Sequence, residues 1–199
     1  MKKKYLWWTL AGVGGAAALA AILWGPIASQ VERARYKTVR RDRDIEIRDY
    51  TPMIVAEVEV SGDREAAIQQ GFRTLADYIF GNNTALRVIT MTAPVTQQGD
   101  EESWRVRFVM PARYTTDTLP RPIDPAVNLK HLEAKRFAAI RFSGSARDAS
   151  LRRHGERLSE FIREKGFRPL SPPAFAFYNP PWTLPFLRRN EVMIEIAQQ

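Results

Sequence analysis

The segment that decides the fold occurs twice in this chain. Residues 45–62 read IEIRDYTPMIVAEVEVSG, and residues 127–144 read VNLKHLEAKRFAAIRFSG. The two align without a gap at a constant offset of 82, and toward its end each places apolar side chains at alternate positions. Alternation of this kind is typical of a strand with one buried face. A pattern that recurs at a long period indicates a duplicated structural unit, so we expect two halves of similar architecture.

Each repeated segment is followed by the spacing of an amphipathic helix. The apolar stripe comprises Ile68, Phe72, Leu75 and Ile79 in the first helix, and Leu151, Leu158 and Ile162 in the second, at an offset of 83. Asp63 is a suitable N-cap for the first helix, and Gly81 and Gly166 are suitable C-terminal stops for the two. Phe72 of the first helix aligns with Gly155 of the second. The first helix therefore presents the bulkier apolar face.

Two more apolar strands are predicted after each helix, at residues 86–92 and 104–110 in the first half and 174–178 and 191–196 in the second. The proline-rich residues 111–125 between the halves indicate a connection. Each unit thus reads ββαββ. The sequence predicts an α+β fold in which the two units form a distorted antiparallel eight-stranded barrel flanked by two helices. Closure is expected because a barrel removes exposed sheet edges.

The N-terminal residues have the pattern of a membrane anchor. Lys2, Lys3 and Lys4 precede an uncharged run over residues 5–29, and about 20 apolar residues in a helix span the hydrocarbon core of a bilayer. The run is longer than a signal-peptide core and lacks a clean cleavage site. We therefore predict three parts: an uncleaved transmembrane anchor at residues 1–29, a basic juxtamembrane linker at residues 30–43, and one barrel domain at residues 44–199.

The side of the membrane is left open by two opposing arguments. The basic residues that follow the apolar run favour a cytoplasmic domain under the positive-inside rule. A short basic N-terminus before an apolar run is, however, more often an exporting anchor. Our interpretation favours an inner-membrane protein whose soluble domain lies in the periplasm, with the cytoplasmic face as the alternative.

Composition narrows the function classes. The net charge is +8, but no helix pattern carries the dense basic stripe of a nucleic-acid-binding protein, so nucleic acid is not expected as a partner. The chain has no cysteine, which excludes thiolate nucleophiles and thiolate metal ligands. It has neither a zinc-protease motif nor a glycine-rich phosphate loop nor a nucleophile elbow. We therefore do not expect an enzyme.

Two segments are too specific in pattern to be read only as scaffold. One is residues 89–95. The other is residues 178–192, in which three prolines fix an extended course around aromatic side chains. Trp182, Arg188 and Arg189 could form a ligand rim whose cations meet carboxylates. The alternative interpretation is a rigid lid that packs over one end of the barrel, and the two interpretations are compatible.

Three motifs carry a family resemblance: EIRDY at residues 46–50, MTAPV at residues 91–95, and the segment at residues 178–192 that ends in RRNEV. With them the chain resembles the SOUL family of haem-binding proteins over residues 44–196. The resemblance implies a duplicated eight-stranded barrel with two helices. It also implies that haem or a related tetrapyrrole binds, without catalysis, in a shallow apolar cleft beside the first helix. Together with the anchor, this predicts a membrane-tethered carrier, buffer or sensor.

The resemblance and the helix pattern together suggest a set of ligand-binding residues, in which Arg73 would meet a propionate and His131 is a candidate axial ligand. Animal members carry Arg and Lys where this chain has Gln69 and Asp77. Two alternatives stay open: a domain of the same fold that binds another small effector, and a protein-interaction module that binds no haem. The expected lining comprises Gln69, Phe72, Arg73, Ala76, Asp77, Ile79 and Met91.

Overall fold

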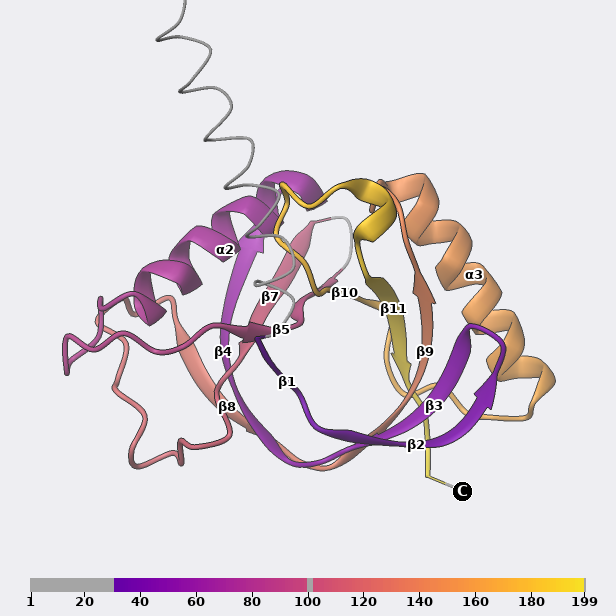
Figure 1. Ribbon diagram of the computed structural model, residues 1–199, viewed down its shortest axis with the longest axis horizontal. Helices are drawn as coiled ribbons and strands as arrows, with labels where there is room; N and C mark the ends of the chain where they lie inside the picture. Colours follow the sequence, from indigo (N-terminus) through magenta and orange to yellow (C-terminus); the bar gives the residue numbers. More distant parts are fainter. Residues whose placement is uncertain (1–30, 100–101, 199) are drawn as a thin grey trace, which may run out of the picture.

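The computed structural model describes residues 31–99 and 102–198 (Figure 1). Nine strands form one antiparallel sheet in the order β2-β3-β9-β11-β10-β6-β7-β4-β8, and β1 and β5 form a short parallel pair. The strands are β1 (Glu32–Arg33), β2 (Tyr36–Asp42), β3 (Ile45–Tyr50), β4 (Met53–Ser61), β5 (Thr92–Ala93), β6 (Val95–Gly99), β7 (Ser103–Val109), β8 (Asn128–Leu132), β9 (Lys135–Phe142), β10 (Ala174–Phe177) and β11 (Asn190–Glu195). The helices are α2 (Arg64–Ile79), α3 (Asp148–Glu164) and the short 3₁₀ helix η1 (Pro185–Leu187).

The predicted duplication is present, and its two units are interleaved. The first unit is β3-β4-α2-β6-β7, and the second is β8-β9-α3-β10-β11. In the sheet, β3 pairs with β9 of the second unit, while β8 pairs with β4 of the first. Outward from the central β6–β10 pair, equivalent strands of the two units follow in the same order: β6-β7-β4-β8 on one side and β10-β11-β9-β3 on the other. The first strand of each unit pairs with a strand of the other unit, so neither half of the sheet consists of one repeat alone.

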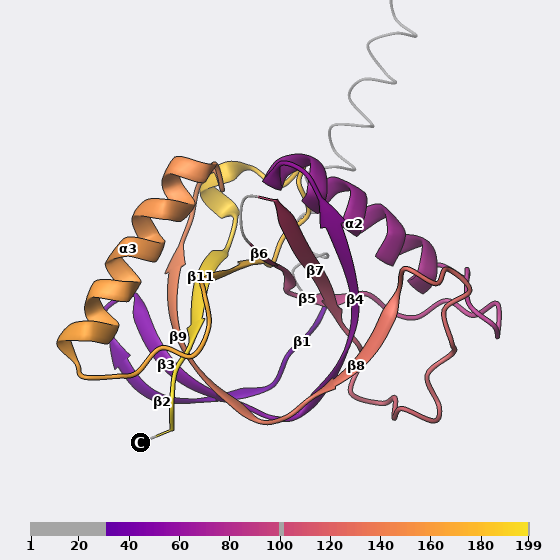
Figure 2. The ribbon, with the colours of Figure 1, turned by 180° about the vertical axis from the view of Figure 1, so that it is seen from behind.

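The predicted closed barrel of eight strands is wrong in two respects. The sheet has nine strands, and it curls into a half-barrel whose edges are β2 and β8 (Figures 1 and 2). The additional strand, β2, lies in residues 30–43, where the sequence predicts a linker. It pairs only with β3, and its side chains are largely exposed and basic. Charged side chains on an edge strand oppose pairing with another molecule, which removes the need for closure.

The strand predicted at residues 86–92 is also wrong, because only Thr92 of that range lies in a strand and β6 starts at Val95. Asn83, which is buried, holds the preceding loop: its amide donates to the carbonyls of Tyr78 and Arg87 at 3.0 and 2.7 Å. Leu86 adopts a positive φ of 51°. These local hydrogen bonds compete with sheet pairing. In this range Leu86 and Val88 are exposed, whereas Ile89 is fully buried.

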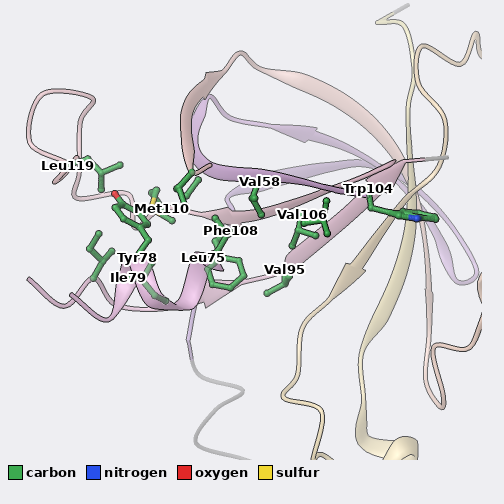
Figure 3. Close-up of a cluster of buried hydrophobic side chains, with 14 of the residues drawn as sticks. Val58, Leu75, Tyr78, Ile79, Val95, Trp104, Val106, Phe108, Met110 and Leu119 are labelled. Atoms are coloured by element: carbon green, nitrogen blue, oxygen red, sulfur yellow. The ribbon is translucent and has the colours of Figure 1, made fainter. Parts of the chain in front are cut away.

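The other strands and both helices follow the sequence pattern closely. Both helices lie on the convex face of the curled sheet, α2 against β4 and β7 and α3 against β9 and β11 (Figures 1 and 2). The predicted cap is present, since the Asp63 carboxylate accepts from the Ala66 N–H at 2.9 Å. Apolar side chains from α2 and the strands beneath it form the core shown in Figure 3. That core includes Val58, Leu75, Tyr78, Ile79, Val95, Trp104, Val106, Phe108, Met110 and Leu119.

The predicted anchor at residues 1–29 lies outside the described residues. Within residues 31–99 and 102–198, the structure contains no helix of the length and apolar character that crossing a bilayer requires.

Candidate functional site

A cleft of about 730 Å³ lies between the N-terminal half of α2, the segment that precedes α3, and the loop that follows β10. Its volume is within the range of small-molecule sites. The lining consists of Val31, Arg64, Glu65, Ile68, Gln69, Phe72, Arg73, Met91, Thr92, Ala93, Val95, Ser145, Ala146, Arg147, Phe177, Tyr178, Asn179, Pro180, Pro181, Trp182, Arg188 and Asn190. Six of the residues predicted for the site are among them: Gln69, Phe72, Arg73, Met91, Trp182 and Arg188.

One wall of the cleft is a face of α2. Ile68 and Phe72 are four residues apart, so their side chains lie on adjacent turns of the same face of the helix. Phe72 is fixed from behind by an edge-to-face contact with Phe108, with ring centroids 5.3 Å apart. Because the ring also belongs to the edge of the core, its position is set by packing and does not depend on a ligand.

The opposite wall comes from the other unit, from β10 and from the proline-rich segment that connects β10 to β11. Phe177, Pro180, Pro181 and Trp182 line this side. Trp182 is 58% exposed, which makes it the most open part of the wall. Rings of proline and aromatic residues give flat apolar surfaces with few internal degrees of freedom. The cleft is therefore flanked by rigid apolar surfaces from two elements that are far apart in the sequence.

One end of the cleft is closed by Arg64, which ties the starts of the two helices together. Its guanidinium forms an ion pair with Asp148 in the first turn of α3 and donates to the Ala146 carbonyl at 3.2 Å. Gln97 on β6, fully buried, donates its amide to the Arg64 carbonyl at 2.8 Å. Arg64 is not among the residues predicted for the site. The repeat itself carried a signal, since Arg64 and Arg147 are related by the helix offset of 83.

Two cations at the cleft have no partner among the described residues. The side chains of Arg73 on α2 and Arg147 at the start of α3 are exposed and form neither an ion pair nor a hydrogen bond with that part of the chain. Arg73 was predicted for this role, and Arg147 was not. Unpaired guanidinium groups beside an apolar wall suit a flat ligand that carries carboxylates, because arginine binds carboxylates with two parallel hydrogen bonds.

Three residues predicted for the site lie away from the cleft, further along α2. Ile79 is buried in the core, and Ala76 packs against the same core. Asp77 is exposed and accepts a hydrogen bond from the Asn82 side chain. The apolar stripe of α2 therefore divides: its first turns face the cleft, and its last turns face the core. Asp77, a carboxylate that would repel an anionic ligand, does not reach the site.

The two rim arginines are both engaged within the protein. Arg188 lines the cleft, but its guanidinium donates to the carbonyls of Thr183 and Pro181 at 2.7 and 2.5 Å. Arg189 points to the other side of the chain, where it donates to Glu191 at 2.7 Å and stacks over Tyr178 at 4.0 Å. Neither is available as a free cation for a ligand, which corrects the expectation of a paired cationic rim.

Glu191 is the centre of a buried polar network on the inner face of the sheet. Its side chain is fully buried and accepts from Arg48 at 2.6 and 3.0 Å and from the Tyr178 hydroxyl at 2.9 Å. Burial alone would raise the pKa of Glu191, but the hydrogen bonds and charges of Arg48 and Arg189 outweigh it, so the pKa is lowered. Burial raises the pKa of Tyr50, which lies beside Arg48, to about 12. The network stays ionised and is fully paired.

Neither histidine lines the cleft. His131, the candidate axial ligand, is exposed, lies 3.3 Å from Glu133, and borders a separate hollow of about 430 Å³. His154 stacks on Phe142 with centroids 3.9 Å apart. Met91 lines the cleft and carries a sulfur that can bind haem iron. No group of three or more His, Asp or Glu among the described residues could hold a metal ion. The residues present thus fit a flat, apolar, anionic macrocycle that is held mainly by its faces and edges.

Solved structures with the same fold are distant in sequence. The C-terminal domain of EcmrR is 11% identical, with a TM-score of 0.62, and the match covers 82% of this chain and 99% of that one. EcmrR in a complex with DNA is 12% identical, with a TM-score of 0.60, over 78% of this chain and 57% of that one. A hydrolase from Listeria innocua is 13% identical, with a TM-score of 0.53, over 80% and 94%. At this identity the likeness shows the fold alone.

Sequence comparison is more specific. None of the curated proteins matches the chain. The profile of the SOUL heme-binding protein family matches residues 31–195, which contain every strand and helix of the structure. The match starts just before β1 and includes β2, so the strand at residues 36–42 belongs to the family domain. With its duplicated half-barrel and the apolar cleft beside α2, the chain belongs to the SOUL heme-binding protein family.

Proposed function

We propose that this protein binds haem or a related tetrapyrrole in the cleft beside α2, without catalysis, as a membrane-tethered carrier, buffer or sensor. One observation carries the proposal. The cleft combines two rigid apolar walls with two arginines, Arg73 and Arg147, that no other described residue pairs with, in a chain whose family is described as heme-binding. A porphyrin has the matching chemistry, because it is flat and apolar and carries carboxylates on one edge.

Apolar burial supplies most of the expected affinity. The ring would lie between Phe72 and Ile68 on one side and Pro181 and Trp182 on the other. Each 100 Å² of apolar surface removed from water is worth about 2.5 kcal/mol before the costs of association. The propionates would meet Arg73 and Arg147 at the solvent side. Those contacts set the orientation of the ring more than its affinity, since exposed ion pairs contribute about 0–1 kcal/mol each.

Iron coordination has a minor place in this proposal. Bound haem would supply a redox-active iron, for which Met91 is the lining residue with a suitable donor sulfur. Because the cleft has no histidine in its lining, we expect the faces of the ring to dominate binding. A metal-free porphyrin should therefore bind with an affinity within about tenfold of that of haem, a difference of about 1.4 kcal/mol.

The membrane tether rests on the sequence. Residues 5–29 are uncharged and long enough to span a bilayer, and they precede the family domain directly. A binding domain that is tethered to the membrane would meet apolar ligands at the membrane surface, where such ligands accumulate. Flotation of the full chain with lipid vesicles on a density gradient tests this part of the proposal by itself.

Titration of residues 31–199 with haemin tests binding. We expect a Soret shift that saturates near one equivalent, and a loss of affinity of at least tenfold in Phe72→Asp, because a carboxylate replaces one wall of the cleft. Phe80→Asp is the matched control, since Phe80 is 64% exposed and lies outside the cleft. It should bind as the parent does.

Phe72 also touches the core, so a second variant guards against misfolding. Arg73→Glu alters an exposed side chain and should weaken haemin binding several-fold while leaving the circular dichroism melt unchanged. A spectral change that does not saturate, or one that persists equally in Phe72→Asp, Arg73→Glu and Phe80→Asp, would reject the cleft as the site. Saturable binding of another amphipathic molecule in that case would favour an effector-binding domain.

A further inference from the structure

We propose that the loop formed by residues 179–188 is a membrane-docking surface, so that the mouth of the cleft faces the lipid bilayer and exchanges its ligand with it. Hereafter we call residues 179–188 the docking loop. The inference rests on the proposed tether and extends it: the bilayer would be a partner of the folded domain as well as of the anchor.

The docking loop exposes apolar side chains at a density that is unusual for a water-facing surface. Trp182, Leu184, Phe186 and Leu187 fall within six residues and are 58%, 52%, 70% and 62% exposed. Single exposed apolar residues are normal, whereas a contiguous group marks an interaction site. Tryptophan, phenylalanine and leucine are also the side chains that bury best at the boundary between lipid headgroups and acyl chains.

The exposure is built into the loop and is not a consequence of a loose segment. Arg188 donates to two carbonyls of the loop, those of Thr183 and Pro181, and so pairs part of its backbone within the protein. The Thr183 N–H donates to the Pro180 carbonyl, and the Pro185 carbonyl accepts from the Gly144 N–H at 2.8 Å. Backbone groups that are already paired can enter a low-dielectric layer at little cost. The loop thus pairs several of its backbone groups within the protein while it exposes four apolar side chains.

The loop lies at the end of the molecule where the chain would leave the membrane. Figure 1 shows η1, which is part of the docking loop, between the ends of α2 and α3. Val31 lines the cleft, and it follows the uncharged run of residues 5–29 after a single residue. Two residues span at most about 7 Å. The end of the uncharged run therefore lies close to the mouth of the cleft, and a bilayer that extends to the end of this run would pass beside that mouth.

The charge around the mouth fits a lipid surface. Arg73 and Arg147 flank the cleft and have no partner within residues 31–99 and 102–198, and basic side chains near an anionic bilayer are attracted to its surface. The same two arginines can meet lipid phosphates when the cleft is empty and ligand carboxylates when it is filled. This arrangement would let a ligand pass between bilayer and cleft without crossing water.

A second exposed apolar group supplies a control within the same chain. Leu86 and Val88 are 80% and 67% exposed in the loop after α2. They belong neither to the docking loop nor to the lining of the cleft. Because they follow the C-terminal end of α2, whereas the cleft lies against its N-terminal half, they should remain in water when the docking loop meets lipid.

Site-directed nitroxide labelling of the full chain tests the proposal. The chain has no cysteine, so Phe186→Cys and Leu86→Cys each give one labelling site. Each labelled protein is reconstituted into vesicles of phosphatidylcholine with phosphatidylglycerol. The accessibility of the label to oxygen, which concentrates in lipid, is compared with its accessibility to a water-soluble nickel chelate. We expect the oxygen-to-nickel ratio to be at least about threefold higher at position 186 than at position 86. Leu187→Cys should behave as Phe186→Cys does.

The outcomes separate the docking surface from the tether. In one outcome, the full chain floats with vesicles while the labels at 186 and 187 are as accessible to nickel as the label at 86. That result would overturn the docking surface and leave the tether intact. A full chain that does not float with vesicles would overturn both. Spin–spin broadening at 186 without a raised oxygen accessibility would show that a second copy of the chain covers the loop, and it would also overturn the proposal.

Discussion

Glu191 illustrates how much of this protein depends on single side chains. In the motif RRNEV at residues 188–192, strand alternation places Arg189 and Glu191 on one face and Arg188 on the other. The first two join Arg48 inside the sheet, and Arg188 holds the docking loop. The motif reads as a cationic rim in the sequence, yet in the structure it stabilises the domain from both sides of one strand.

Substitution of Glu191 should be severely destabilising. Glu191→Gln removes the buried carboxylate that pairs with both Arg48 and Arg189 and leaves Arg48 with Glu46 as its remaining countercharge. Breaking a buried ion pair in this way costs about 3–5 kcal/mol of unfolding free energy. Urea unfolding followed by circular dichroism measures the loss. Glu160→Gln is the matched control: its partner Arg163 is 77% exposed, so the change should stay within about 0.5 kcal/mol. Equal and small effects would show that the buried network contributes little to stability.

At the scale of elements, the two helices are equivalent in topology but not in packing. The stripe of α2 includes Phe72, which extends into the cleft, whereas the aligned position in α3 is Gly155. Helix α2 therefore forms a wall of the cleft, whereas α3 packs against β9 and β11. The difference follows from a single pair of aligned residues, and it was visible in the sequence.

Two buried helix glycines should respond to alanine in opposite directions. A Cβ at Gly71 of α2 would lie 2.6 Å from a methyl carbon of Val106. Gly71→Ala should therefore cost about 1–3 kcal/mol through overpacking. A Cβ at Gly155 of α3 would find its nearest neighbours at 3.9 and 4.0 Å. Gly155→Ala should add up to about 1 kcal/mol, the difference in helix propensity. Thermal melts of both variants measure these changes. Shifts of the same sign would contradict the packing described for α2.

At the scale of the whole molecule, the decisive feature is the exchange of first strands between the units. The pairings β3–β9 and β8–β4 each join one unit to the other, and β6–β10 joins them at the centre. The cleft has the same origin, since its walls and its two arginines come from both units. Site and sheet are therefore properties of the pair of units and of neither alone.

Neither half should fold by itself. In residues 31–110 alone, β3 would keep only β2 as a partner, and the remaining sheet would consist of β6, β7 and β4. In residues 111–199, β8 would have no partner. We expect each half to show a random-coil circular dichroism spectrum and an equimolar mixture to recover strand signal. The intact domain should unfold in one cooperative transition. A stable, cooperatively melting half would refute the interleaved arrangement.

Local sequence determined the features that depend on neighbours within a few residues: the duplication, both helices, the Asp63 cap, most strands, and the side of α2 that bears Phe72 and Arg73. Tertiary structure decided the rest. Strand pairing partners, the ninth strand and the open edges depend on contacts between residues far apart in the chain, for which periodicity contains no signal. The same holds for the site. Arg189 is engaged by Glu191 and by Tyr36, which lies 153 positions away, whereas the Arg147 side chain has no partner among the described residues. The sequence shows which chemical group each side chain carries, but the fold decides whether that group already pairs with another residue of the protein.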